Sequence, residues 1–430
     1  MQTQLAEFIR DTATGREADA ILRACVHCGF CTATCPTYQL TGDELDGPRG
    51  RIYLVKQMLE TGTASAVTLH HLDRCLLCRS CETTCPSGVR YGRLAEIGRA
   101  VAETLSPRPR PRPLADRIKR RALRWAVPEP VRFRTLLAVL NRLRWLLPIR
   151  YARQLPSFPR RREPSPIELD ARLRGHDETQ SHATPARRHP RTMLILEGCV
   201  QSVVTPKVNA AARRLFDGLG VSLIAAPEAG CCGALNTHLS ARAEGQDQMR
   251  RNIDAWWPHI EAGAEAILVT ASGCGAMVKD YGIALRDDPH YADKARRVSE
   301  LARDPCEVLT ADDLIRLGIK GHGRRIAFQS PCSLQHGQRL DGRIEALLSA
   351  VDFELTPVAD GHLCCGSAGS YSVLQPGLSE ALRENKLAAL MAGKPEVIVT
   401  ANIGCQMHLA GKSELPVMHW LEVLNEAATC

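Results

Sequence analysis

The sequence has few aromatic residues and lacks a long apolar run. Phe, Trp and Tyr account for 19 of its 430 residues. Its longest apolar stretches, such as residues 136–140, are much shorter than the roughly 18 residues that cross a bilayer. The first ten residues contain Glu7 and lack the apolar segment of a secretory signal. We therefore expect a cytoplasmic protein without a membrane-spanning segment.

Nucleotide-binding motifs are missing as well. No G-x-G-x-x-G opens a helix after an expected strand, and no Walker-type phosphate loop is present. The sequence therefore shows no site for a nicotinamide, a flavin or a nucleotide. We expect no catalytic residue for hydride chemistry in this chain, and any flavin would lie on partner subunits.

Cysteine, in contrast, is abundant. The chain contains 18 cysteines, and its 44% hydrophobic and 24% charged residues are typical of a soluble globular protein. At about 100 to 200 residues per domain, its length predicts two to four domains. A chain of this size does not need disulfides for stability. In a reducing compartment, clustered cysteines more often bind metal or carry out redox chemistry.

The first hundred residues contain one cysteine motif twice. Cys25-Val-His-Cys-Gly-Phe-Cys-Thr-Ala-Thr-Cys-Pro36 has the pattern C-x2-C-x2-C-x3-C-P, and Cys75-Leu-Leu-Cys-Arg-Ser-Cys-Glu-Thr-Thr-Cys-Pro86 repeats it. Three thiolates at this spacing bind three irons of a cubane, and the cysteine before the proline ligates the other cluster. The motifs therefore predict two [4Fe–4S] clusters with crossed ligation. The first is assigned to Cys25, Cys28, Cys31 and Cys85, and the second to Cys75, Cys78, Cys81 and Cys35.

Other interpretations of this motif are less favoured. Zinc needs only two C-x2-C pairs and has no use for a third evenly spaced cysteine or a trailing proline. His27 lies inside the first motif, where it would have to displace a cysteine that already fits, so we expect it beside the cluster. Arg49 and Arg51 could donate to cluster sulfurs or to a partner, and plain surface charge explains them equally well.

The C-terminal half contains a second internal repeat, built around Cys-Cys-Gly. The two sets are Cys199, Cys231, Cys232 and Cys274, and then Cys332, Cys364, Cys365 and Cys405, at offsets of 131 to 133 residues. At the same offset Arg250 aligns with Arg383, and Asn252 aligns with Asn385. The region is therefore a duplicated domain.

Each repeat alternates short aliphatic runs with helical patterns. The expected strands are residues 193–196, 221–225, 266–270, 325–328, 353–358 and 397–400. This alternation predicts an α/β fold with a mostly parallel sheet, and the cysteines follow strand ends, where ligands collect. Spacing alone leaves open whether the eight cysteines hold an iron–sulfur cluster, hold zinc, form a redox dithiol or are simply buried. Cys306 and Cys430 have no counterpart and are expected to be bystanders.

A basic segment separates the two cysteine-rich regions. Residues 101–191 contain 22 Lys and Arg against 8 Asp and Glu, although the net charge of the whole chain is only +8. Alternating Pro and Arg at 106–113 exclude a helix there. Helical patterns follow at 114–127 and 131–147, and a Pro- and Arg-rich stretch at 156–190 ends the segment.

The expected fold class is multidomain, with an α-helical di-cluster ferredoxin domain followed by a duplicated α/β cysteine-rich domain. The expected units are a ferredoxin-like domain at 1–105, a basic Pro/Arg-rich connector with amphipathic helices at 106–190, and cysteine-rich repeats at 191–320 and 321–430.

These motifs resemble those of a known family. Residues 22–38, the turn at 42–51 and Ala401-Asn-Ile-Gly-Cys405 are similar to the iron–sulfur subunits of bacterial glycolate oxidase, also called glycolate dehydrogenase, over essentially the whole chain. More widely, the repeats resemble cysteine-rich domains of heterodisulfide reductases, anaerobic glycerol-3-phosphate dehydrogenase subunits and lactate-utilisation proteins. Heterodisulfide reductase repeats end in Cys-x-x-Cys, whereas Ala271 and Asn402 occupy the earlier position here, so each repeat keeps four cysteines.

The closer resemblance implies a subunit of an oxidoreductase complex. Separate flavin-bearing glycolate oxidase subunits would oxidise glycolate to glyoxylate, while this chain passes the electrons toward a quinone-type acceptor. The connector would dock an acidic face of a partner, lie on anionic lipid at the inner membrane or simply be solvated. We expect no nucleic-acid partner, because no reader module is present.

Three alternatives stay open. The chain could serve another flavin dehydrogenase, of lactate or glycerol 3-phosphate. It could be a thiol–disulfide reductase acting at the Cys-Cys-Gly repeats, or a metal-stabilised scaffold without a redox role.

Overall fold

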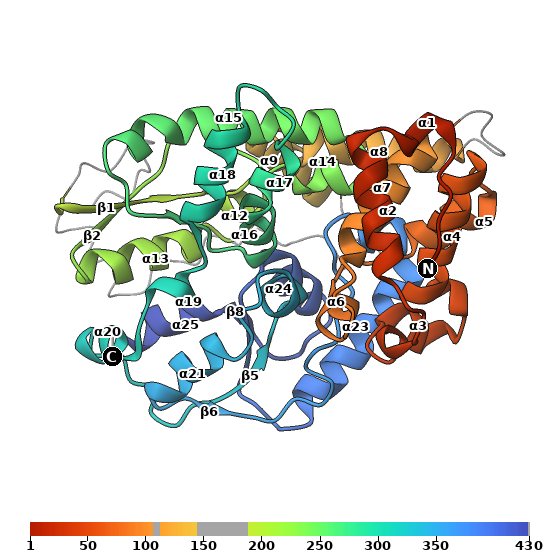
Figure 1. The fold of residues 1–430 in the computed structure, drawn as a ribbon. Coiled ribbons are helices and arrows are strands. Elements are labelled where there is room, and N and C mark those ends of the chain that lie inside the picture. Colours follow the sequence, from red (N-terminus) through yellow and green to blue (C-terminus); the bar gives the residue numbers. More distant parts are fainter. Residues whose placement is uncertain (106–111, 144–187, 429–430) are drawn as a thin grey trace.

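Three units lie side by side in the protein (Figure 1). The computed structural model describes residues 1–105, 112–143 and 188–428. A helical unit, red and orange in Figure 1, lies beside two α/β units, of which the first is green and the second teal to blue. The architecture confirms the expected fold class of a helical N-terminal unit followed by a duplicated α/β unit.

The helical unit surrounds a small apolar core. Leu22, Val55, Leu59 and Leu94 are fully buried in it. Pro36, which ends the first cysteine motif, is also the first residue of a helix, where its missing N–H and its preset φ cost nothing. The helices are α1 (Glu7–Arg10), α2 (Ala13–Ala24), α3 (Pro36–Thr41), α4 (Pro48–Thr61), α5 (Ala66–Asp73), α6 (Ser80–Thr83) and α7 (Tyr91–Thr104), with 3-10 turns at Phe30–Thr32 and Glu44–Asp46.

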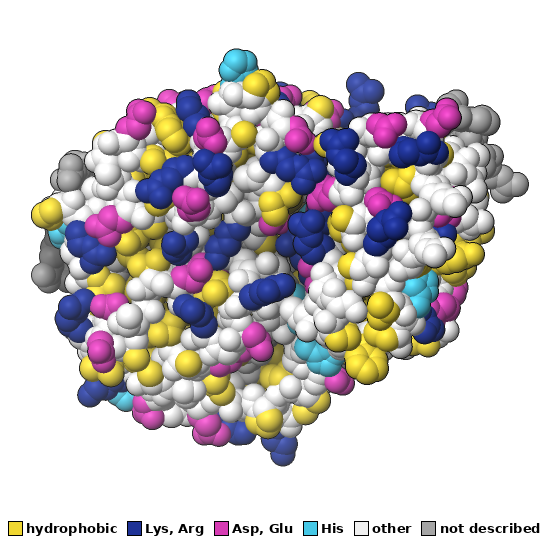
Figure 2. Space-filling view, in the orientation of Figure 1, with side chains coloured by type: hydrophobic (Ala, Val, Ile, Leu, Met, Phe, Trp, Pro, Cys, Tyr) yellow, Lys and Arg dark blue, Asp and Glu magenta, His cyan; other side chains and the backbone are white. Residues whose placement is uncertain are grey.

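The connector contributes two helices, α8 (Leu114–Ala126) and α9 (Pro130–Arg142), close to the ranges that the sequence predicts. They lie between the helical unit and the first α/β unit (Figure 1). The expected continuation to residue 147 and most of the two Pro- and Arg-rich stretches lie outside the described residues. On the face shown in Figure 2, Lys and Arg side chains are interspersed with acidic ones rather than gathered into one continuous surface.

Each α/β unit contains a four-stranded parallel sheet. The first has the order β2-β1-β3-β4 and the second the order β6-β5-β7-β8. The strands are β1 (Arg191–Ile195), β2 (Val221–Ile224), β3 (Ile267–Leu268), β4 (Ala302–Arg303), β5 (Arg325–Gln329), β6 (Glu354–Leu355), β7 (Val397–Thr400) and β8 (Val417–His419). Sequence analysis missed β4 and β8, because neither lies in an aliphatic run like those that mark the other strands.

Helices cover both sheets. In the first unit they are α12 (Gln201–Val204), α13 (Pro206–Gly218), α14 (Ala234–His238), α15 (Arg242–Glu261), α16 (Ser272–Lys279), α17 (Tyr281–Ala284), α18 (Ala292–Leu301), α19 (Pro305–Val308) and α20 (Ala311–Arg316). In the second they are η4, a π-helical turn (Ser333–Gly337), α21 (Arg343–Ala350), α22 (Tyr371–Leu374), α23 (Pro376–Met391), α24 (Ile403–Ala410) and α25 (Trp420–Ala427).

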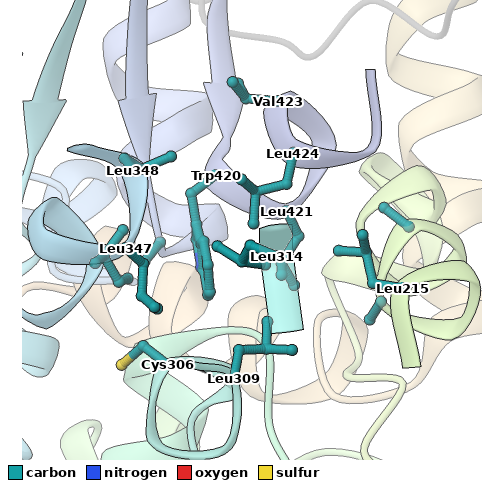
Figure 3. Packing of buried hydrophobic residues seen from close by; sticks show 14 of the residues in the cluster. Leu215, Cys306, Leu309, Leu314, Leu347, Leu348, Trp420, Leu421, Val423 and Leu424 are labelled. Atoms are coloured by element: carbon teal, nitrogen blue, oxygen red, sulfur yellow. The ribbon is translucent and has the colours of Figure 1, made fainter. Parts of the chain in front are cut away.

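The two α/β units share one apolar core. Trp420 and Leu424 of α25 lie in the same buried cluster as Leu215 of α13 and Leu314 of α20 (Figure 3). His419 adds a polar tie, since its Nε2 lies 3.0 Å from the backbone oxygen of Thr270. Because a close-packed core resists relative movement, the cysteine loops of the two units have set positions relative to each other.

Candidate iron–sulfur sites

Two cavities lie between the cysteine loops of the helical unit. The first is lined by Cys25, Cys28 and Cys31 of the first motif together with Cys81 and Cys85 of the second. The second is lined by Cys35 of the first motif together with Cys75, Cys78 and Cys81 of the second. The last cysteine of each motif therefore lies beside the first three cysteines of the other motif. Crossed ligation of two cubanes requires this arrangement.

The two cysteine loops have the same backbone shape. His27 and Gly29 have positive φ angles in the first loop, and Leu77 and Arg79 have them at the matching positions of the second. Only one of these four residues is a glycine, so the other three are held in a left-handed conformation that costs energy. Such strain is typical of functional loops. The sequence could show the repeated cysteines but not this backbone, because three of the four residue types do not favour it.

Cys75 has several groups around its sulfur. The Leu77 amide donates to Cys75 Sγ at 3.4 Å, and the Tyr91 hydroxyl donates to it at 3.6 Å. Burial alone would raise the pKa of Cys75, but the guanidinium groups of Arg51 and Arg99 lower that pKa below its usual value. The protein therefore favours the thiolate form, which is the form that ligates iron.

Arg51 is the centre of a buried ionic network in the wall of the second cavity. Its side chain is 1% exposed. The guanidinium donates to the His71 oxygen (2.8 Å) and to Thr37 Oγ1 (3.0 Å), and it pairs with Asp46 (3.3 Å). Asp46 is also paired with Arg74 Nη1 (2.7 Å) and lies 2.8 Å from His71 Nδ1. Each buried charge thus has a partner, as charges in a protein interior require.

The two remaining candidates of this region, Arg49 and His27, have different surroundings from Arg51. Arg49 is half exposed and pairs with Glu44 at 2.6 Å, although its side chain also borders the first cavity. His27 Nε2 lies 2.7 Å from the Met1 sulfur, also in the wall of that cavity. Arg51 is therefore not the surface charge that the sequence left open.

The Cys-Cys-Gly repeats each bring four sulfurs together. In the second repeat Cys332 Sγ lies 3.8 Å from Cys364 Sγ, and the contacts continue through Cys365 to Cys405. The first repeat has the same chain of contacts, from Cys199 through Cys231 and Cys232 to Cys274. All eight side chains are buried or half-buried. The donor set in each repeat is therefore four adjacent thiols.

The glycine after each cysteine pair is required by close packing. Gly233 and Gly366 have φ angles of 90° and 88°. A Cβ atom would lie 2.7 Å from the Gly245 oxygen at the first position and 2.6 Å from the Ser379 oxygen at the second. The cysteine loops therefore rest directly on the following helices, α15 and α23.

This contact corrects the sequence alignment of the two repeats. Because Gly245 and Ser379 occupy the same place, Asn252 of α15 corresponds to Lys386 of α23, seven residues further along each helix. The predicted pairing of Asn252 with Asn385 is wrong, since Asn252 is fully buried and Asn385 is exposed. The pairing of Arg250 with Arg383 is wrong as well, because the same one-residue shift places Arg383 at the position of Met249. An offset read from the cysteines misses the extra residue before α23.

Asn402 occupies the position of a fifth cysteine and contacts the sulfur next to it. Its Nδ2 donates to Cys405 Sγ at 3.5 Å, and its Oδ1 accepts from the Gly273 amide of the first repeat at 3.2 Å. Ala271 fills the equivalent position of the first repeat and has no polar side chain to offer. Cys306 lies in the shared core (Figure 3), away from both sets, and Cys430 lies outside the described residues.

The donor chemistry of the helical unit fits iron–sulfur clusters. Each cavity is lined by at least four cysteines, and amide, hydroxyl and guanidinium groups around them can stabilise anionic sulfur. Asp43, Asp46 and His71 also lie close enough together to bind a metal ion. We assign no metal to them, because Asp46 is already paired with two arginines.

Comparison with known proteins agrees with these sites. Residues 21–89 match the family described as 4Fe-4S dicluster domain, and residues 193–279 and 326–410 each match the family described as Cysteine-rich domain. The chain is 29% identical to the probable glycolate oxidase iron-sulfur subunit of Bacillus subtilis (strain 168), over 94% of this chain and 93% of the relative. It is 26% identical to lactate utilization protein A of Geobacillus thermodenitrificans (strain NG80-2), over 53% of this chain and 95% of the relative.

The family of the chain is shown by a relative of higher identity. The glycolate oxidase iron-sulfur subunit of Escherichia coli (strain K12) is 54% identical over 99% of both chains. A match of that extent leaves neither the helical unit nor either repeat unaligned. The protein therefore belongs to the family of glycolate oxidase iron–sulfur subunits and is an iron–sulfur electron-transfer protein.

Proposed function

We propose that this chain is the iron–sulfur subunit of a glycolate oxidase complex. It receives electrons from flavin-bearing partner subunits that oxidise glycolate to glyoxylate, and it passes them toward a quinone-type acceptor. The observation that carries the proposal is the pair of adjacent cavities, each lined by cysteines from both motifs. The name of the relative at 54% identity supplies the substrate.

The proposed ligands follow the crossed arrangement. The first [4Fe–4S] cluster is held by Cys25, Cys28, Cys31 and Cys85, and the second by Cys75, Cys78, Cys81 and Cys35. When bound, such clusters supply one-electron transfer. The chain's own residues hold the sulfurs in place, bury them and set the charge around them. Cys81 borders both cavities, so the two sites are neighbours within one small core.

The chain's sequence supports placing substrate oxidation on a partner. It contains no phosphate-binding motif for a flavin or nicotinamide. Glycolate oxidation removes two electrons as a hydride or its equivalent, and cysteine-ligated iron carries electrons singly. A flavin on a partner subunit would accept the two electrons together and pass them to the iron centres one at a time.

We also propose that the complex lies on the inner membrane and that α8 makes the contact. No helix among the described residues is long and apolar enough to span a bilayer. α8 contacts the rest of the chain through its charged side: Arg120 pairs with Asp73 at 3.2 Å, and Arg124 pairs with Glu244. A helix that packs in this way turns its apolar side outward.

The outward side of α8 suits anionic lipid. Leu114, Ile118 and Trp125 lie on one stripe of the helix, and each is more than half exposed. Arg117 and Arg121 lie beside the stripe and form no ion pair within the described part of the chain. Apolar side chains flanked by arginines are typical of helices that lie in a lipid headgroup layer.

Substrate specificity tests the proposal. The chain is purified with its flavin-bearing subunits, and reduction of a quinone analogue is measured with glycolate, lactate or glycerol 3-phosphate. We expect activity with glycolate, and we expect Cys78→Ser to abolish quinone reduction while glycolate still bleaches the flavin. A preference for lactate or glycerol 3-phosphate would show that glycolate is not the substrate of the complex. Disulfide reduction by the chain alone would refute the proposed electron-transfer function.

A further inference from the structure

The two Cys-Cys-Gly repeats differ in what lies next to them. Cys332 and Cys364 of the second repeat belong to one cluster of contacting side chains with Cys78 of the helical unit. Leu76 and Tyr371 complete the contact between the two units in this cluster. The second repeat therefore places its thiols directly against a proposed ligand of the second [4Fe–4S] cluster.

Two hydrogen bonds hold this contact in place. The Tyr371 hydroxyl donates to the backbone oxygen of Arg74, the residue before Cys75, at 3.1 Å. Thr83 Oγ1 lies 3.0 Å from His336 Nδ1, on the π-helical turn that follows Cys332. The junction is thus polar as well as apolar, and it surrounds the cysteines.

The thiols of the first repeat have different neighbours. Cys232 and Cys274 lie in an apolar cluster made only of residues from the first repeat. Val200, next to Cys199, packs against Phe133 and Leu137 of the connector helix α9. The first repeat does touch the helical unit, since Arg79 pairs with Asp280 at 2.6 Å, but that contact joins side chains other than thiols.

The second repeat also buries a cation beside its thiols. Lys386 is 4% exposed, and its ammonium donates to the backbone oxygens of Asp360 (2.8 Å) and Gly361 (3.3 Å). No carboxylate pairs with it in the portion of the chain that the structure describes. Burial lowers the pKa of Lys386 below its usual value, and the neighbouring Cys365, Cys364 and Asp360 only partly oppose this effect.

The first repeat carries no such cation at the equivalent place. Asn252 occupies it and donates to the Cys231 oxygen at 3.0 Å and to the Tyr281 hydroxyl at 3.0 Å. One turn earlier, the second repeat buries Arg383 where the first has Met249. The second repeat thus has two cations at helix positions that are neutral in the first repeat, where Arg251 is the basic residue near Cys231.

A cation buried beside four thiols favours a centre that carries negative charge over a neutral one. A disulfide between Cys332 and Cys364 would be neutral and would do nothing to offset the charge of Lys386. Four thiolates around a doubly charged metal core leave a net negative charge, which Lys386 would partly offset. Zinc would satisfy this charge count but carries no electrons, so it has no use for the contact with Cys78.

We propose that Cys332, Cys364, Cys365 and Cys405 hold an iron centre, that this centre and not the first repeat takes electrons directly from the Cys78 cluster, and that Lys386 is the positioning residue that offsets its charge. The inference rests on the proposed electron-transfer function. One electron leaves the reduced cluster, which is oxidised, and enters the second-repeat centre, which is reduced. No proton or group is transferred.

The first test uses matched cysteine variants of the full chain, purified without oxygen. In the wild-type protein, the paramagnetic resonance signal of the reduced Cys78 cluster should be broadened both by the first cluster and by the second-repeat centre. Cys364→Ser should lower the iron per chain and leave only the broadening that the first cluster causes, and Cys231→Ser, its counterpart in the first repeat, should keep the full wild-type broadening. Equal broadening in the wild type and Cys364→Ser, or a loss in Cys231→Ser alone, would overturn the proposal.

The second test separates Lys386 from a structural role. Lys386→Asn installs the residue of the first repeat, and it should shift the one-electron equilibrium of the second-repeat centre at least tenfold toward the oxidised form, or 59 mV. Lys386→Arg should restore the wild-type potential. An unchanged potential in an iron-loaded Lys386→Asn protein would refute the role.

The two proposals fail in different ways. If the Cys78 cluster is absent or cannot be reduced, the electron-transfer function itself is wrong. If that cluster is intact and reducible while the second-repeat thiols bind no iron, only the further inference is wrong.

Discussion

Arg51 and Arg49 stand two residues apart on α4 and make a matched pair for testing burial. Arg51→Gln removes one of the two arginines paired with the fully buried Asp46, so we expect it to lower the free energy of unfolding by up to about 3–5 kcal/mol. Arg49→Gln breaks a half-exposed pair with Glu44 and should cost less than about 1 kcal/mol. Thermal or denaturant unfolding measures both. Equal losses would mean that the Arg51 network does not stabilise the fold.

The crossed ligation can be tested by comparing residual spectra. If Cys35 shares a cluster with Cys78, then Cys35→Ser and Cys78→Ser should leave the same paramagnetic resonance spectrum, that of the other cluster. Likewise, Cys85→Ser and Cys28→Ser should leave a matching spectrum of their own. If instead Cys35→Ser resembles Cys28→Ser, each motif ligates its own cluster and the assignment fails.

The residues that sequence analysis could predict are those whose type and spacing carry the chemistry. Cysteines at fixed offsets identify both motifs, because few other sites need that pattern. Arg51 and Lys386 could not be assigned in this way. A lone basic residue in a sequence does not show whether it is buried, and the role of Lys386 depends on a one-residue shift between the repeats.

At the level of single elements, α8 gives a prediction about lipid. Ile118 on α8 and Ile315 on α20 are 58% and 59% exposed, so they are a matched pair. We expect Ile118→Glu to weaken co-sedimentation with vesicles of anionic lipid about tenfold, since burial of an isoleucine contributes about 1.5–3 kcal/mol. Ile315→Glu should bind as the wild type does. If neither variant weakens binding, or if the wild-type chain binds only a partner subunit, α8 is not a lipid-binding element.

The loops of the Cys-Cys-Gly repeats give a second prediction at this scale. Gly366 and Gly263 have φ angles of 88° and 92°, but a Cβ atom would clash with the Ser379 oxygen at Gly366 and meet open space at Gly263. In both alanine variants the left-handed backbone lowers the free energy of unfolding. Gly366→Ala should lower it by about 1–3 kcal/mol more, because its Cβ atom overpacks the site. Unfolding midpoints of the two variants measure the difference. A loss no greater than that of Gly263→Ala would contradict the packing.

Elements with a clear apolar pattern were predictable, and those without one were not. The connector helices and six strands follow from apolar spacing, and the structure places α8 within a residue of the expected range. The strands β4 and β8 were missed because no aliphatic run surrounds them, whereas such runs marked the equally short β3 and β6. The sequence also could not show that α8 packs through its charged side, because an amphipathic pattern alone does not say which side faces the protein.

At the scale of the whole molecule, the helical unit and the second repeat bring their cysteine sites together in one continuous region. Three cysteine sets follow one another in space: the first cavity, the second cavity that shares Cys81 with it, and the second repeat in contact with Cys78. The bonds from Tyr371 to Arg74 and between Thr83 and His336 hold that contact in place. Sequence analysis separated these units at a basic connector and gave no indication that their thiols meet.

The iron and acid-labile sulfide content of the anaerobically purified chain tests the central claim most directly, with paramagnetic resonance before and after reduction. Two cubanes require about eight iron atoms per chain, and iron in the second repeat raises the number further. We predict more than eight iron atoms and mutually interacting signals that appear on reduction. Little iron after careful anaerobic work, or iron that no reductant reduces, would contradict the electron-transfer function.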